Sequence, residues 1–192
     1  MNETVKLGLI LLIISAVAAG LLGLSNAVTS ERIAQADKIA NDLAKQEVLS
    51  EAESFVTLDE AKLKDIAGAE SNIVEINEGY DSSSNLVGYT IKATTNGYGG
   101  EIQFMVGIST EGRITGFKVL SHTESPGLGA NSEKSYFTDS FIGKSAGGSL
   151  TSAKEPKADN EVQALTSATI TTNAIVDGVN KVLDVYNTKL SN

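Results

Sequence analysis

One long stretch without a charged side chain constrains this sequence more than any other feature. It runs from Leu7 to Ser30 and reads LGLILLIISAVAAGLLGLSNAVTS. At ~1.5 Å per residue, a helix of about 20 such residues crosses the ~30 Å hydrocarbon core of a bilayer. We therefore expect residues 1–30 to form a single-pass anchor in the cell membrane.

A cleaved signal peptide is the alternative interpretation of this stretch. The triplet Ala-Val-Ala at positions 16–18 resembles a cleavage site, and Lys6 supplies a charged start. Leu21, Leu22 and Leu24 continue the apolar run past that site, so cleavage would leave an apolar new terminus. This continuation favours the uncleaved anchor.

Charge does not decide which side of the membrane the rest of the chain occupies. Lys6 and the α-amino group flank the apolar run on one side, and Arg32, Lys38 and Lys45 lie within ~20 residues on the other. Counting alone leaves a cytoplasmic domain open. The absence of cysteine agrees weakly with an oxidising outer space. We expect the domain on the extracytoplasmic side.

The composition excludes several classes of function. Only Glu3 and Lys6 are charged before residue 31, so the net charge of −9 belongs to the remainder and argues against a nucleic-acid partner. With no cysteine and one histidine, His122, the sequence predicts no metal site. No serine stands beside an obvious base, so we expect no catalytic residue of a hydrolase.

Beyond the apolar run, the hydrophobic period predicts an α+β fold with an antiparallel meander and flanking helices. The expected boundaries are a membrane anchor at 1–30, a helical stalk at 31–55 and one domain at 56–192. The expected elements are helices at 31–53, 58–67, 133–142 and 169–186, strands at 73–76, 86–95, 101–109 and 113–120, and a surface loop at 143–161.

A hydroxyl-rich segment opens the last predicted helix. Residues 163–172 read QALTSATITT, in which five of ten residues carry a hydroxyl. Free amides and the positive end of the helix dipole suit a phosphate there, and a threonine in that field suits a phosphoester. The alternative is that Thr166 or Ser167 simply caps the helix.

A second segment, SHTESPGLGA at 121–130, directly follows a predicted strand. Its glycines let backbone amides approach a planar ligand or an anion closely. An ordinary strand-to-helix turn is the alternative. Taken alone, His122 is typical of a surface or capping histidine.

Together these two segments resemble a known family. The sequence is similar to the G subunit of the Rnf electron-transport complex, which is related to the C subunit of the sodium-pumping NADH:quinone oxidoreductase. The resemblance covers nearly the whole chain, from the membrane helix through SHTESPGLGA to ALTSATIT and the closing helix. Members of this family are membrane-anchored proteins that bind FMN.

The resemblance implies that FMN is attached covalently, through a phosphoester to Thr169. The family motif is an acid, two variable residues, Ser or Thr, Gly, Ala and Thr; here Gln163 replaces the acid and Ser167 replaces the glycine, while Glu161 is an acid close by. Ser125 stands where the family more often has Thr. The resemblance places these residues around the cofactor: Thr166, Ser167, Ala168, Thr169, Ile170, Thr171, Thr172, His122, Thr123, Glu124, Gly127, Leu128 and Gly129.

The family also implies the function and the partners. An Rnf complex oxidises reduced ferredoxin, reduces NAD⁺ and moves an ion, and this subunit relays electrons within it. The implied partners are the other membrane subunits and a flavin-transferring maturation enzyme. Two alternatives stay open: a C-type subunit of the quinone-linked sodium pump, and a tethered binding module without a cofactor.

Overall fold

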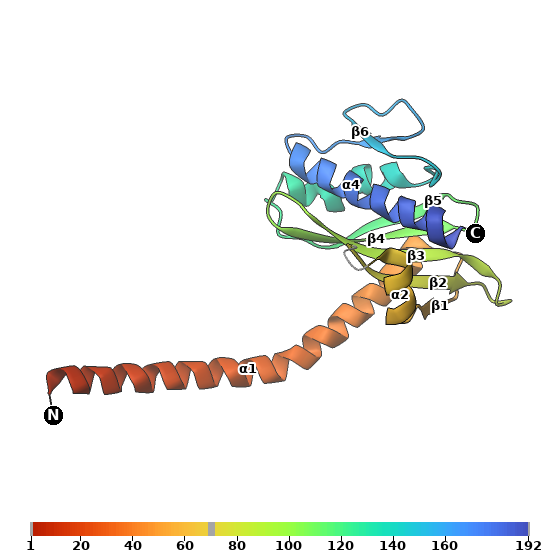
Figure 1. Ribbon diagram of the computed structural model, residues 1–192. Coiled ribbons are helices and arrows are strands. Elements are labelled where there is room, and N and C mark those ends of the chain that lie inside the picture. The colour runs from red at the N-terminus through yellow and green to blue at the C-terminus, as the bar shows by residue number, and fades with distance from the viewer. Residues whose placement is uncertain (1, 69–71, 192) are drawn as a thin grey trace. The chain divides into compact units, whose positions relative to one another are not determined.

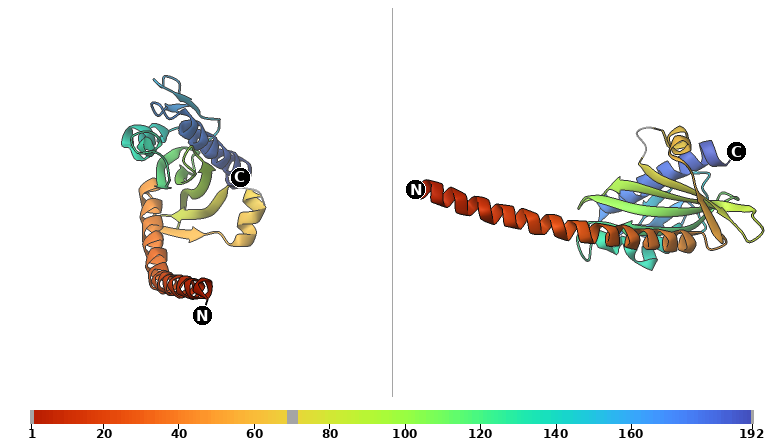
Figure 2. Two further views of the ribbon diagram at one scale, coloured as in Figure 1. Left: turned by 90° about the vertical axis from the view of Figure 1, so that its left-hand side faces the viewer. Right: turned by 90° about the horizontal axis from the view of Figure 1, so that it is seen from below.

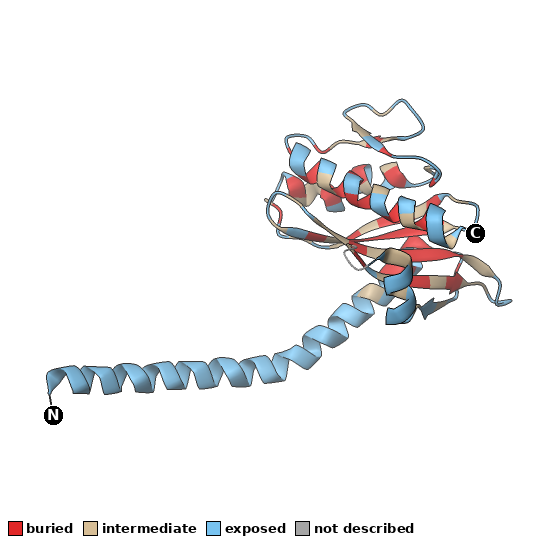
Figure 3. Ribbon diagram, viewed as in Figure 1, coloured by how far each residue is buried: buried red, intermediate tan, exposed pale blue. Residues whose placement is uncertain are grey.

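The structure, a computed structural model, describes residues 2–68 and 72–191. The chain divides into two compact units, with the division between Asn41 and Asp42. The first unit is the greater part of helix α1 (Glu3–Val48), whose side chains are exposed throughout this unit except at Asn41 (Figure 3). This helix is long and apolar enough to cross a membrane. It continues without a break beyond the apolar run and ends at Val48, earlier than the expected 53.

The second unit is built on a five-stranded antiparallel sheet in chain order (Figure 1). Each strand pairs with the next along the chain, so the predicted meander is confirmed. The first strand has only four residues, too few to show an alternating pattern, and the sequence did not predict it. The strands are β1 (Ser54–Thr57), β2 (Ile73–Tyr80), β3 (Leu86–Asn96), β4 (Glu101–Ser109) and β5 (Ile114–Ser121).

Helix α4 (Thr169–Val185) covers one face of this sheet. The even-numbered residues of β4 from Ile102 to Ile108 are fully buried in the same core as Ile175 and Val179 of α4. A Cβ on Gly178 would lie 2.9 Å from Cζ of Phe104, so the helix lies directly on that ring. The predicted final helix is confirmed, and it ends in a π turn at Tyr186–Leu190.

The last turns of α1 lie on the opposite face of the sheet (Figure 2). Ala44 and Val48 pack against Met105, which alternates with the α4-facing residues of β4. Gly107 and Gly116 are paired across β4 and β5, and a Cβ on Gly116 would lie 2.5 Å from Cα of Val48. The paired glycines therefore let the backbone of the helix end touch the sheet.

An ion pair between Lys45 and Glu75 joins the end of α1 to β2. Nζ of Lys45 lies 2.8 Å from Oε1 of Glu75, and the lysine side chain is 9% exposed. Burial raises the pKa of Glu75, but the hydrogen bonds from Lys45 and Asn77 and the charges of Lys45 and Lys92 outweigh it, so the pKa is lowered. The carboxylate is therefore better stabilised in the folded chain than in the unfolded chain.

This ion pair predicts a loss of stability in acid. Since the folded pKa of Glu75 is lowered, its contribution is present above the ordinary value of 4.5 and is lost as the pH falls through the folded value. Glu75→Gln should cost roughly 1–3 kcal/mol at neutral pH, because Lys45 loses its main partner while buried. Urea unfolding of the variant and wild type at neutral and acidic pH measures this. The difference should shrink in acid; a constant difference would show that the charge of Glu75 contributes nothing.

The prediction of one continuous helix at 133–142 is wrong. The chain instead forms three short turns, η1 (Gly129–Glu133), α3 (Ser135–Thr138) and η2 (Asp139–Phe141). Hydroxyl groups bond to local carbonyls here, as Ser140 does to Phe137 at 2.6 Å, and such bonds compete with a regular helix. Phe137 and Phe141 are both fully buried by this arrangement.

The expected surface loop at 143–161 contains secondary structure that the sequence did not predict. Strand β6 (Thr151–Ala153) pairs in parallel with β7 (Glu161–Gln163), outside the main sheet. Each strand has three residues, which is below the length at which an alternating pattern can be recognised. The short helix predicted at 58–67 is present as α2 (Glu60–Ala67), capped by Asp59 and ended by Gly68.

Candidate functional site

The two segments singled out in the sequence lie side by side around one cavity of about 520 Å³. The loop after β5 forms one wall, and the start of α4 forms another. The turn between β3 and β4 contributes a third part of the wall. The residues that line the cavity are Tyr98, Glu124, Ser125, Leu128, Gly129, Ser167, Ala168, Thr169, Ile170 and Thr171.

Helix α4 begins at this cavity without a side-chain cap. Its N-cap residue is Ala168, whose side chain cannot accept a hydrogen bond, so the alternative interpretation, capping by Thr166 or Ser167, is wrong. Thr172 accepts from the amide of Leu165 at 3.0 Å and donates to the carbonyl of Ala168 at 2.9 Å. The amides of the first turn have no acceptor within the helix, which leaves them available to an anion. The side chain of Thr169 is exposed there.

Ser167 has a left-handed backbone, with a φ of 60°. Glycine adopts this conformation without the steric cost of a Cβ, which explains why glycine suits this position of the motif.

Ser167→Gly should therefore raise the free energy of unfolding by about 0.5–1 kcal/mol, once the greater freedom of glycine in the unfolded chain is subtracted. Thermal unfolding measures the change. Ser149→Gly, in an exposed loop, is a control for the loss of a serine side chain, because no described hydrogen bond involves its hydroxyl. A Ser167→Gly variant less stable than wild type would contradict the argument from strain.

Glu124 is the one acid in the wall, and it is only 6% exposed. Its Oε1 accepts from the amide of Gly99 at 2.8 Å, and its Oε2 accepts from the hydroxyl of Thr171 at 2.6 Å. The carboxylate thus links the β3–β4 turn to the first turn of α4. A Cβ on Gly129 would collide with this carboxylate and lie 2.8 Å from Oγ1 of Thr171, so that glycine makes room for Glu124.

Five of the residues expected at the site do not line the cavity: Thr166, Thr172, His122, Thr123 and Gly127. His122 holds the loop together instead, because its Nδ1 accepts from the amide of Glu124 at 3.1 Å and its Nε2 lies 3.2 Å from Oε1 of Glu133. Thr123 donates to the carbonyl of Gly99 at 2.9 Å. These two residues therefore stabilise the loop that forms the wall without lining the cavity themselves.

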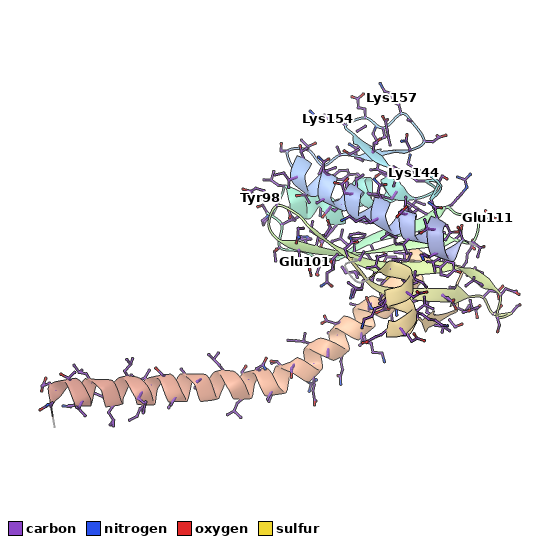
Figure 4. All side chains as sticks on the ribbon, in the orientation of Figure 1. Tyr98, Glu101, Glu111, Lys144, Lys154 and Lys157 are labelled. Atoms are coloured by element: carbon purple, nitrogen blue, oxygen red, sulfur yellow. The ribbon has the colours of Figure 1, made fainter. Side chains whose placement is uncertain are left out.

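The sequence reasoning missed two lining residues, Tyr98 and Ser125. Tyr98 stands at the tip of the β3–β4 turn, at the end of the domain where α4 begins (Figure 4). It is 71% exposed, and Leu128 and Ile170 are also exposed. The available signal was an aromatic residue within the glycine-rich run NGYGG. The three side chains give the cavity an apolar rim, which suits a flat aromatic ring.

The cavity wall contains no basic side chain. Its ten residues, all within the described part of the chain, include one acid and no Lys, Arg or His. A phosphate bound here would be neutralised by backbone amides and the helix dipole alone.

Gln163, which replaces the acid of the family motif, and the nearby acid Glu161 both form hydrogen bonds within their own part of the chain. Nε2 of Gln163 donates to the carbonyls of Lys154 and Ala164, at 2.9 and 3.2 Å. Glu161 accepts from the amides of Lys157 and Ala158, and these bonds lower its pKa. Glu161 therefore stabilises its own loop.

Curated relatives align with nearly the whole chain. The G subunit of the Na⁺-translocating ferredoxin:NAD⁺ oxidoreductase complex of Acetobacterium woodii is 43% identical, over 94% of this chain and 90% of the relative. The G subunit of the ion-translocating oxidoreductase complex of Methanosarcina acetivorans is 34% identical, over 95% and 94%. The chain belongs to the family of G subunits of ion-translocating oxidoreductase complexes. These complexes are redox enzymes, and the family predicted from the two segments is confirmed.

This G-subunit chain also matches the family model of the FMN-binding domain over residues 97–184. The match includes every residue of the cavity wall. Two solved C subunits of the Na⁺-translocating NADH–quinone reductase share the fold. The protein of Parabacteroides distasonis has a TM-score of 0.61 at 19% identity, covering 84% of this chain and 97% of that one. The protein of Shewanella oneidensis has a TM-score of 0.54 at 20% identity, covering 72% and 70%.

Proposed function

We propose that this chain is a membrane-anchored electron-transfer subunit of an ion-translocating ferredoxin:NAD⁺ oxidoreductase, carrying FMN covalently on Thr169. One observation carries the proposal. The cavity within the FMN-binding domain is lined by the uncapped first turn of α4, and Thr169 is an exposed hydroxyl in that turn. The amides hold the phosphate, and the apolar rim of Tyr98, Leu128 and Ile170 receives the ring.

The charge of the cavity favours covalent attachment over reversible binding. An anionic flavin finds one acid and no basic side chain in the wall, on a chain with a net charge of −9. A reversible site is filled only as the ratio of ligand concentration to Kd allows, whereas an ester bond removes this dependence. This advantage is greatest where free flavin is scarce, so we place the domain on the extracytoplasmic side.

The attachment forms a bond between Oγ1 of Thr169 and the phosphorus of FMN. A flavin dinucleotide is the donor class that provides a leaving group, because its pyrophosphate bond breaks and a nucleoside monophosphate departs with the electron pair. The threonine loses its hydroxyl proton to solvent. We assign catalysis of this step to a flavin-transferring maturation enzyme, since no basic side chain of the described wall adjoins Thr169.

The bound FMN accepts and passes on electrons, and the protein binds and orients it. The proposed organisation is an anchor at residues 1–30, a stalk over residues 31–41 and the FMN domain from there to residue 192. The end of α1 and strand β1, expected in the stalk, are assigned to the domain because they lie in the second unit. The other membrane subunits of the complex are the electron donor and acceptor. The relatives favour this assignment over a C-type subunit, because the identity to G subunits reaches 43% and that to the two C-subunit structures is 19–20%.

Flavin fluorescence after denaturation tests the proposal. The protein is purified from membranes of its native host, denatured and separated on a gel under ultraviolet light. We expect a fluorescent band at the mass of this chain, because an ester survives denaturation. A yellow native protein whose band is dark would leave FMN binding but contradict the covalent bond. A colourless native protein would favour the tethered module without a cofactor.

A further inference from the structure

The cavity wall contains a buried carboxylate that the attachment of FMN does not use. Glu124 is 6% exposed, although acids are almost never buried without partners. Its partners are the amide of Gly99 and the hydroxyl of Thr171, both of them neutral. Among the described residues, no Lys, Arg or His forms an ion pair with it.

The surrounding backbone is shaped to keep this carboxylate in place. A Cβ on Gly97 would lie 2.6 Å from Cδ1 of Ile102 and would collide with Oε1 of Glu124. Gly129 leaves room for Oε2 in the same way. The β3–β4 turn, the loop after β5 and the start of α4 therefore all adapt to one acidic side chain. A glutamine could satisfy the same two hydrogen-bonding partners, so the geometry alone does not require a charge.

We infer that Glu124 is a positioning residue whose charge also lowers the reduction potential of the flavin. The inference rests on the proposed function, because it requires FMN in this cavity. Reduction of FMN by two electrons and one proton, with the electrons supplied by a donor subunit, leaves the ring with one more negative charge. A carboxylate in the same poorly solvated wall opposes this gain, since like charges repel more strongly at low dielectric constant.

Two substitutions separate the charge from the position. Glu124→Gln removes the charge and keeps the length: its oxygen accepts from Gly99 and its amide donates to the hydroxyl of Thr171. Glu124→Asp keeps the charge and is too short to reach both partners. Glu101→Gln is the matched control, because it removes an exposed acid from the neighbouring strand β4, outside the cavity wall.

The experiment is a spectroelectrochemical titration of each flavin-loaded full-length chain, with thermal unfolding of the same chains without flavin. We expect Glu124→Gln to shift the two-electron equilibrium toward reduced flavin at least tenfold, which is about 30 mV. The equilibrium constant for flavin reduction in Glu124→Asp should stay within about threefold of the wild-type value. The Asp variant should unfold at a lower temperature, because it loses a hydrogen bond. Glu101→Gln should change neither property.

The outcomes distinguish the inference from the proposed function. An unchanged potential in Glu124→Gln, or equal shifts in the Gln and Asp variants, would overturn the inference while the flavin stays bound. If Glu124→Gln fails to fold, Thr171→Val takes its place, because it leaves the charge with one donor fewer. In Thr171→Val the two-electron equilibrium of the flavin should shift about threefold toward the oxidised form, because the less neutralised carboxylate repels the reduced ring more strongly. An unchanged equilibrium would overturn the inference. A wild-type chain that never acquires flavin would contradict the proposed function itself.

Discussion

Thr169→Ala should abolish covalent flavin while leaving the fold intact. Thr169 is exposed at the first position of α4, and no described hydrogen bond of its side chain holds the helix. Alanine is also a good helix former, so the substitution removes the nucleophilic oxygen and little else. Co-expression with the flavin-transferring enzyme, followed by fluorescence of the denatured band, measures the loss. Circular dichroism should show an unchanged helix content.

Thr166→Ala and Thr172→Ala are the controls for Thr169→Ala. Thr166 is exposed outside the cavity wall, so its alanine variant should keep its fluorescence. Thr172 is buried and bonded to Leu165 and Ala168, so its variant should lose roughly 1–3 kcal/mol of stability and still retain flavin. Fluorescence that persists in Thr169→Ala and disappears in Thr166→Ala would move the attachment site to Thr166.

Phe141→Ala should destabilise the domain by about 3–5 kcal/mol. Phe141 is fully buried, and its ring stacks on Phe117 of β5 with centroids 4.4 Å apart. Phe137 meets it edge-on at 5.3 Å. Removing the ring would leave a cavity that the short turns of 129–141 cannot fill without moving. Urea denaturation of the variant and wild type measures the loss.

Tyr136→Ala is the matched control, because Tyr136 is a neighbouring aromatic residue that is 50% exposed. Its substitution should change the free energy of unfolding by no more than about 0.5 kcal/mol. Neither Tyr136 nor Phe141 lines the cavity, so flavin should remain on the Tyr136 variant. Equal losses of stability in the two variants would show that burial of Phe141 does not hold the turns on the sheet.

The sequence predicted the elements whose pattern is local and long. The strand at 101–109 and the start of α4 at Thr169 were predicted to the residue, because each combines a clear hydrophobic period with turn residues at its ends. The short turns at 129–141 and the strands β6 and β7 were not, because their conformation follows from burial of Phe137 and Phe141 and from pairing of three-residue strands. Such tertiary effects leave no period in the sequence.

Part of the candidate site could likewise be predicted from the sequence, and part could not. The two chemical segments were recognisable because each is contiguous in the chain, and the structure places both at one cavity. The role of Tyr98 was missed because the turn that carries it is distant in sequence from both segments. The sequence predicts that Gly129 lets a ligand approach; the glycine lines the cavity and also makes room for the buried carboxylate of Glu124. Glu124 itself was expected at the site, but only the three-dimensional contacts could reveal its burial and its bonds to Gly99 and Thr171.

Peptide mass spectrometry of the native protein tests the central claim most directly. Trypsin cuts after Lys157 and Lys181, which releases one peptide that contains Thr166, Ser167 and Thr169. We expect this peptide to carry the mass of FMN less one water, and fragmentation should locate the added mass on Thr169. An unmodified peptide in protein from the native membrane, or an added mass on another residue, would contradict the account.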